Sequence, residues 1–346
     1  MSTSVYDKND LPDRFGAMTI KELRQGMRRG IFIVPFIVIQ LLAVLSMLME
    51  FNSGDVERHS DMAGMLNPAL FFSSGPFWLV AGLVCILIMP LGGLALMGQE
   101  LEEGNHELLL MTPLTRWKVI RGKFLALWGL CLVTFVSLMP YLIVRYFTGG
   151  IDTWRNIVMS FSVVGYSAMF AAGAIGASGY KTIVGRIAVM ILFLGSMALG
   201  GLGPLMGCAY RTEGCGIFYH LNALAFAFCY TLFGLGLARS RIRLVVHQYE
   251  VKPSWMVMGL LIFTPLVAGM TTAMSTGYAG FIGLIGMGLV AWYADMTPKA
   301  PAWMKAPTAN IPPTAQSQAV PPQIPMVGGP EMKQDEQAPA ETPPVS

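Results

Sequence analysis

Long apolar stretches separated by short polar segments dominate the pattern of this chain. Eight stretches carry charged residues only at their ends, and they cover residues 31–51, 76–98, 124–146, 156–178, 183–206, 216–238, 255–274 and 277–295. A bilayer core of ~30 Å needs ~20 consecutive apolar residues per helix. A β-barrel would instead show alternating segments of about 10 residues, which runs such as IFIVPFIVIQLLAVLSMLM exclude. The pattern predicts an all-α integral membrane protein with about eight transmembrane helices.

The distribution of charge predicts an orientation for these helices. Apolar residues make up 54% of the 346 positions and charged residues 12%, about half the charged share of a soluble domain. With eight spans and a cytoplasmic N-terminus, 19 of the 23 Lys and Arg residues fall in cytoplasmic segments, as the positive-inside rule requires. The N- and C-termini are therefore expected in the cytoplasm. Trp78, Trp154, Trp255 and Trp292 fall at span ends, where aromatic rings favour the headgroup level.

A short polar leader precedes the first span and contains TIKELRQGMRRG. Thr19 followed by Glu22 fits a capping box, so a helix is expected to start at Ile20. At 100° per residue, its apolar side carries Ile20, Leu23 and Met27, and its polar side carries Lys21, Arg24, Gln25 and Arg28. Such a basic amphipathic helix suits the inner membrane surface. A plain positive anchor before the first span is the simpler alternative.

Three further segments have distinct expected roles. Spans seven and eight are joined by little more than Ser275 and Thr276, which predicts a tight helical hairpin. Residues 297–346 hold 12 of the 22 prolines and are expected to form a disordered cytoplasmic tail, either solvated or bound to a partner. Cys208 and Cys215 share one outer loop, where an oxidising exterior permits either a disulfide or two free thiols.

A charged island, QELEEGNHELLLMTPLTRWKVIRGK at residues 99–123, lies between spans two and three. Its first third is acidic, its last third is basic, and a leucine run lies between them. Thr112 suits an N-cap and Pro113 the first helical position, so a second helix is expected to start at Pro113 and to continue into span three. An ordinary connector would explain the basic third. The carboxylates and leucines favour a docking element on the cytoplasmic side.

Several chemistries are not supported by the sequence. The nearest approach to a P-loop, GYKT at 179–182, departs from the required spacing, and the four His residues show no metal-ligand spacing. Ser178 and His220 are expected near opposite ends of spans four and six, too far apart for a nucleophile and its base. Between the span ends there is no Asp, Glu, Lys or Arg, which disfavours an ion-coupled carrier. The chain is expected to be no enzyme and to hold no cofactor or metal.

The island resembles the region after the second span of type-2 ABC transporter permeases, the membrane subunits of many ATP-driven exporters. The matching positions are Glu103, Gly104, Glu107, Leu108, Leu109, Thr112, Pro113, Leu114, Thr115, Gly122 and Lys123. The leader helix is similar to the interfacial helix of that family, and the resemblance covers roughly residues 20–240. It implies a leader at 1–29, a six-span core at 30–240 with coupling helices at 99–123, an accessory hairpin at 241–296 and the tail at 297–346.

The resemblance also implies partners and a site. It implies a separate ATP-binding subunit that carries ATP and Mg, a second permease copy as a homo- or heterodimer, and a place in the bacterial cytoplasmic membrane, with no nucleic acid. The residues expected to contact the ATPase are Glu103, Glu107, Leu109, Pro113 and Arg116, with Lys21, Arg24 and Arg28 of the leader helix. A non-transporting membrane scaffold that recruits cytoplasmic proteins and an ion-gradient-driven carrier are the alternatives.

Overall fold

The computed structural model describes residues 17–53, 71, 74–95, 116–148, 153–180, 182–209, 217–246 and 255–294, and it contains no strand within these ranges. The helices are α1 (Ala17–Arg28), α2 (Gly30–Ser53), α4 (Pro76–Gly82), α5 (Met89–Leu91), α8 (Arg116–Ser137), α9 (Met139–Thr148), α10 (Thr153–Ser178), α11 (Ile183–Ala209), α12 (Ile217–Val246), α13 (Trp255–Met274) and α14 (Gly280–Tyr293). A π-helix, η1 (Leu83–Ile88), joins α4 to α5, and a 3-10 helix, η2 (Gly92–Ala95), follows α5. In the described part, seven helical segments are long and apolar enough to cross a membrane, which confirms an all-α integral membrane protein.

Prolines explain where two of these spans change their helical geometry. Pro140 lacks an N–H and its ring crowds the carbonyl four residues earlier, so α8 ends at Ser137 and α9 begins at Met139. Between them, the Leu138 N–H donates to the Phe135 carbonyl at 3.0 Å. Pro90 follows the π-helix, where the Met89 N–H donates to the Val84 carbonyl. Both spans remain continuous enough to cross the membrane, as Pro76–Leu94 and Trp117–Phe147.

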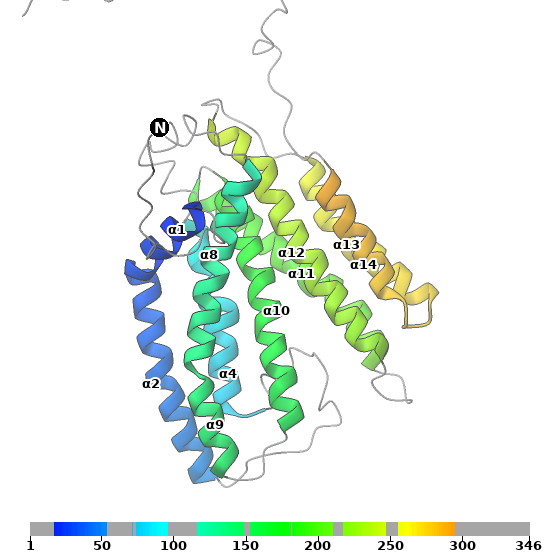
Figure 1. Cartoon of the computed structure of the whole chain (residues 1–346). Helices are drawn as coiled ribbons and strands as arrows, with labels where there is room; N and C mark the ends of the chain where they lie inside the picture. The colour runs from blue at the N-terminus through cyan, green and yellow to red at the C-terminus, as the bar shows by residue number, and fades with distance from the viewer. Residues whose placement is uncertain are drawn as a thin grey trace, which may run out of the picture. The chain divides into compact units, whose positions relative to one another are not determined.

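Side-chain contacts fix the direction in which successive helices run. We call the end of the helices beside α1 the α1 end and the opposite end the Glu50 end. Lys123 of α8 contacts Glu22 of α1, whereas Arg145 of α9 contacts Glu50 at the end of α2. The α8–α9 span therefore runs from the α1 end to the Glu50 end, antiparallel to α4, and Figure 1 shows this arrangement. Successive spans alternate in direction, as the predicted topology requires.

Helices α10 and α12 run parallel and pack closely on small residues at the centre of the core. A Cβ atom on Gly234 would lie 2.4 Å from the carbonyl carbon of Ala172, and one on Gly176 would lie 2.8 Å from the Gly234 carbonyl oxygen. Small residues at helix interfaces let backbones approach closely in lipid. Glycine at these two positions therefore lets α10 and α12 pack closely.

The predicted hairpin of spans seven and eight is present as α13 and α14, which pack against each other. Gly277 adopts a φ of 104° in the turn, and the Gly277 N–H donates to the Thr272 carbonyl at 2.8 Å. This turn uses residues assigned to span eight, and Ala294 is already extended. The eighth predicted span is consequently observed as a 14-residue helix, shorter than the ~20 residues of a full span.

The predicted start of the leader helix is wrong. α1 begins at Ala17, so Thr19 and Glu22 lie inside the helix and do not form a capping box. Both side chains are buried, and Glu22 faces Lys123 of α8. The Glu22 carboxylate pairs with Lys123 of α8. This long-range contact takes the place of the local capping box that the sequence suggested.

Candidate functional site

The predicted coupling site falls only partly within the described residues. Glu103, Glu107, Leu109 and Pro113 lie outside them, so their roles stay predictions. Arg116 is the first residue of α8, and its side chain is not described. Lys21, Arg24 and Arg28 are described on α1, and all three are exposed. The described part of the site therefore consists of α1 and the first turns of α8.

An ion pair between Glu22 and Lys123 joins these two helices. The Lys123 ammonium donates to Glu22 Oε1 at 3.3 Å, and the two side chains are 1% and 5% exposed respectively. A charge in such a buried position is stable only when it is paired and hydrogen-bonded. Removing one partner of a buried pair costs about 3–5 kcal/mol. The pair therefore fixes α1 against α8 at one defined position.

A side-chain contact extends the junction by one turn of α1. A Cβ atom on Gly26 would lie 2.7 Å from Leu130 Cδ1, so a larger residue there would have to displace the Leu130 side chain. Thr19, Glu22 and Gly26 share the face of α1 that meets α8, and Leu23 packs against the main core. The opposite face presents the three basic side chains. The inner face is therefore partly polar and differs from the predicted apolar side of Ile20, Leu23 and Met27, of which Met27 is exposed.

The first turns of α8 also pack into the core. Val119, Ile120 and Phe124 are buried against Ala171 and Ile175 of α10, in a cluster that includes residues of α12. The end of the island that the structure describes is thus a rigid continuation of a membrane span, as the expected second helix required.

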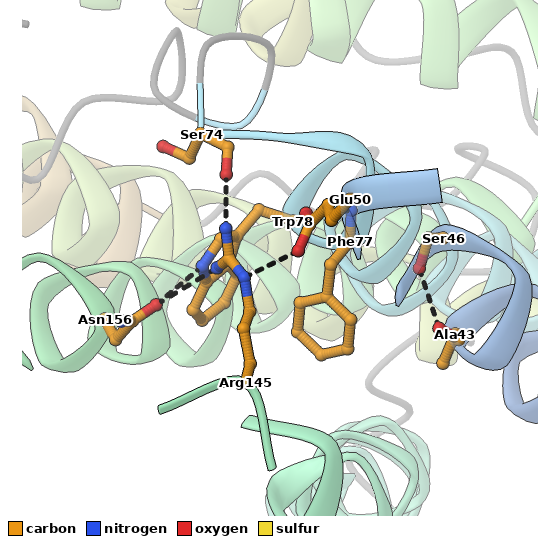
Figure 2. Close-up of polar contacts among 8 residues, drawn as sticks. All are labelled: Ala43, Ser46, Glu50, Ser74, Phe77, Trp78, Arg145 and Asn156. Atoms are coloured by element: carbon orange, nitrogen blue, oxygen red, sulfur yellow. Dashed lines mark hydrogen bonds and ion pairs between the residues drawn. The ribbon is translucent and has the colours of Figure 1, made fainter. Parts of the chain in front are cut away.

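A second polar group, which we call the Glu50 cluster (Glu50, Ser74, Arg145, Arg155 and Asn156), lies at the Glu50 end. Figure 2 shows Glu50, Ser74, Arg145 and Asn156 of this cluster. Arg145 Nε donates to Glu50 Oε2 at 2.8 Å and Arg145 Nη2 donates to the Ser74 carbonyl at 3.1 Å. Arg155 Nη2 donates to Ser74 Oγ at 2.8 Å. Both arginines are almost wholly buried. The cluster joins α2, α9, α10 and the segment that precedes α4.

The same carboxylate also closes the N-terminus of α4. The Phe77 N–H donates to Glu50 Oε1 at 3.2 Å, and a negative charge is favourable beside the unsatisfied N–H groups of a helix start. Gly75 has a φ of 100°, and a Cβ atom there would lie 2.6 Å from Glu50 Oε1. Trp78, expected at the headgroup level, is instead buried and donates to Asn156 Oδ1 at 2.8 Å. Glu50 therefore acts as both ion-pair partner and helix cap.

A third polar contact lies where α10 ends, beside the α1 end of α12. Arg241 Nη2 donates to the Tyr180 hydroxyl at 2.7 Å, and its guanidinium carbon lies 4.0 Å from the centre of the Tyr180 ring. Burial raises the pKa of the Tyr180 hydroxyl, and the Arg241 charge partly opposes that shift. Arg186 Nε donates to the Tyr180 carbonyl at 2.8 Å. These contacts anchor the short connection from α10 to α11.

An apolar groove of about 460 Å³ lies among α4, η1, α10, α11 and α12. Leu83, Met169, Leu202 and Phe226 are among the apolar side chains that line it. Ligand sites of small molecules span ~300–1,000 Å³, so the groove has the size of such a site. Leu83 and Leu202 in its lining are exposed, so the groove opens on the surface of the helices.

The described part of the chain shows neither a disulfide nor a metal site. Cys85, Cys131 and Cys229 are buried free thiols. Cys208 belongs to the end of α11 without a described side chain, and Cys215 lies outside the described residues, so their pairing stays a prediction. Within the described ranges, no group of three His, Cys, Asp or Glu residues could hold a metal ion.

Sequence reasoning missed both buried ion pairs. The partners are separated by 101 residues in Glu22–Lys123 and by 95 residues in Glu50–Arg145. Each residue had a local explanation, as a helix cap, a membrane anchor or a boundary charge. The one available signal was that Glu50 lies at the end of an apolar run, since a carboxylate in that position requires a partner.

The apolar helices describe a protein that spans the membrane several times, and two buried ion pairs join these helices near their ends. The comparison with protein families identifies the class further: the model of the ABC-2 family transporter protein matches residues 17–214, which is more than half of the chain. The chain therefore belongs to the ABC-2 transporter family and is a permease-type membrane component, as its resemblance had indicated. The search of curated proteins found no match. The search of solved structures found none either.

Proposed function

We propose that this chain is the membrane-spanning permease of an ATP-driven exporter and that a separate chain hydrolyses the ATP. Membership of the ABC-2 family supports the permease role. The energy would enter through residues 99–123 together with the basic face of α1. ATP and Mg would be held by the partner, and two permeases would associate with two ATPase subunits in the bacterial cytoplasmic membrane.

The contact between α1 and α8 carries this proposal. The two segments that the sequence assigns to the ATPase contact are far apart in the chain, yet Glu22 and Lys123 join them through a buried ion pair. The exposed Lys21, Arg24 and Arg28 then lie on a helix fixed beside the end of the island. One docking surface composed of both segments follows from this adjacency. An ordinary connector would not require such a junction.

The helices suggest how work would cross the membrane. Closure of two ATPase subunits would displace residues 99–123 and α1 together, because the buried pair links them. α8 and α9 lead from that point to Arg145 in the Glu50 cluster. A partner can drive such a change only if it binds the two states with different affinity. The ATP-bound and ATP-free forms of the ATPase would supply that difference.

The proposal is tested by reversing two charges of the island. The double variant Glu103→Lys, Glu107→Lys is expected to insert normally and to lose permease-dependent stimulation of ATP hydrolysis in membrane vesicles that contain both subunits. A matched control reverses two charges in the tail, Asp335→Lys and Glu336→Lys, and should keep the stimulation. Unchanged stimulation in the island variant would contradict the proposed docking role.

A further inference from the structure

The start of α8 meets the C-terminal hairpin through a pair of tryptophans. The rings of Trp117 and Trp292 have centroids 4.6 Å apart and planes at 85°, an edge-to-face arrangement. Such pairs contribute beyond their buried area because the positive edge of one ring meets the negative face of the other. Arg239 Nη1 of α12 donates to the Trp292 carbonyl at 3.5 Å. Three helices, α8, α12 and α14, thus meet at one point at the α1 end.

The helix that carries Trp292 is firmly attached to the core. A Cβ atom on Gly288 would lie 3.0 Å from the Cys229 Cα of α12, and one on Gly283 would lie 2.4 Å from Thr271 Oγ1 of α13. Leu284 and Ala291 are fully buried. Close packing of this kind resists displacement. Because α14 packs closely against α12 and α13, Trp292 is a fixed support for the residue that contacts it.

The first turns of α8 are consequently held from two sides. Trp117 rests on α14, and Lys123 is paired with Glu22 of α1. The two residues are six positions apart, and with about 3.6 residues per turn they face different directions. Trp117 belongs to the island, one residue after Arg116, so support at this position acts directly on the segment that would receive the ATPase.

We propose that the α13–α14 hairpin positions the coupling segment and that Trp292 is the positioning residue, acting through Trp117. This inference rests on the proposed function and gives a role to the two helices beyond the six-span core. With the Trp292 ring in place, the start of α8 is ordered before the ATPase binds. Without the Trp292 ring, the start of α8 becomes ordered only when the ATPase binds. The affinity then falls because part of the binding free energy is used to order this segment.

The test is the affinity of the purified partner ATPase for the full chain in detergent or nanodiscs. Trp292→Leu keeps an apolar side chain and removes the ring pair, and it should weaken binding about three- to tenfold. Trp292→Phe should retain most of the affinity because the edge-to-face contact can still form. Tyr293→Leu alters the neighbouring side chain, which is 80% exposed, and should bind as the wild type does.

A double-mutant cycle separates positioning from general destabilisation. Trp117→Leu should cause a similar loss of affinity, and combining it with Trp292→Leu should add little, because both remove the same contact. Additive losses, or wild-type affinity in Trp292→Leu, would overturn the inference and leave the proposed function standing. A wild-type chain that binds no ATPase would overturn the proposed function and this inference with it.

Discussion

Loss of one partner of the Glu22–Lys123 pair should release α1 from α8. Glu22→Leu removes the Glu22 carboxylate from the Lys123 ammonium, which is 1% exposed, and Lys123→Met removes the ammonium from the buried Glu22 carboxylate. Removing one partner of a buried pair costs about 3–5 kcal/mol. Each kcal/mol lowers the melting temperature of a mid-sized domain by about 2–4 °C. Either single variant should therefore melt roughly 6–20 °C below the wild type.

The double variant distinguishes an ion pair from ordinary packing. Glu22→Leu combined with Lys123→Met replaces both charges by apolar side chains, and such replacements are commonly neutral or stabilising. Most of the lost stability should thus return in the double variant. The apparent melting temperature can be followed by size-exclusion chromatography of the detergent-solubilised chain after heating. Faster tryptic cleavage at the exposed Arg24 and Arg28 should accompany each single variant, because α1 becomes detached.

Two results would refute this reasoning. Single variants that melt like the wild type would show that the pair contributes nothing to the junction. Losses that add in the double variant would show that each residue acts separately, through packing alone. Gly26→Ala supplies an independent check, because its added carbon would lie 2.7 Å from Leu130 Cδ1, and it should increase cleavage of α1 without any change in charge.

Three further predictions concern packing, the Glu50 cluster and topology. Gly234→Ala should cost about 1–3 kcal/mol of stability by overpacking and should lower the melting temperature. Gly195→Ala, with open space around it, should melt as the wild type does. Equal melting temperatures of the two variants would contradict the α10–α12 interface. Gly75→Ala should destabilise the chain, because its φ of 100° and the nearby Glu50 oxygen both exclude a side chain, and an unchanged melting temperature would refute that geometry. In a chain with Cys208→Ser and Cys215→Ser, a cysteine at His106 should react with a membrane-impermeant maleimide only in inverted vesicles. Labelling of intact cells would contradict the predicted cytoplasmic island.

The positions of the spans were predictable because the signal is long and local. Each predicted stretch from 31–51 to 255–274 overlaps a helical segment long and apolar enough to cross a membrane, and 255–274 matches α13 at both ends. The helices α8 and α12 extend eight residues beyond the predicted stretches 124–146 and 216–238. A run of about 20 apolar residues has few other solutions in a bilayer. The eighth span was predicted too long because the turn at Gly277 and the extended Ala294 depend on backbone geometry, which hydropathy does not report.

The contacts between helices were not predictable in the same way. Glu22 and Thr19 match a capping box, and nothing in the sequence favours the observed partner 101 residues away over that local solution. Trp292 fits a headgroup-level aromatic equally well, yet its ring contacts Trp117. Pairings of this kind depend on which helix faces meet, and a single sequence with many apolar helices allows several such arrangements.

The central claim is that this chain receives its energy from a separate ATPase that docks on residues 99–123 and α1. Its most direct test is co-purification from the native membrane in mild detergent, with the bound proteins identified by mass spectrometry. The account predicts a P-loop ATPase in near-equal amount with the wild-type chain and its loss with Glu103→Lys, Glu107→Lys. Recovery of the chain without any ATPase would contradict the claim and would favour a membrane scaffold.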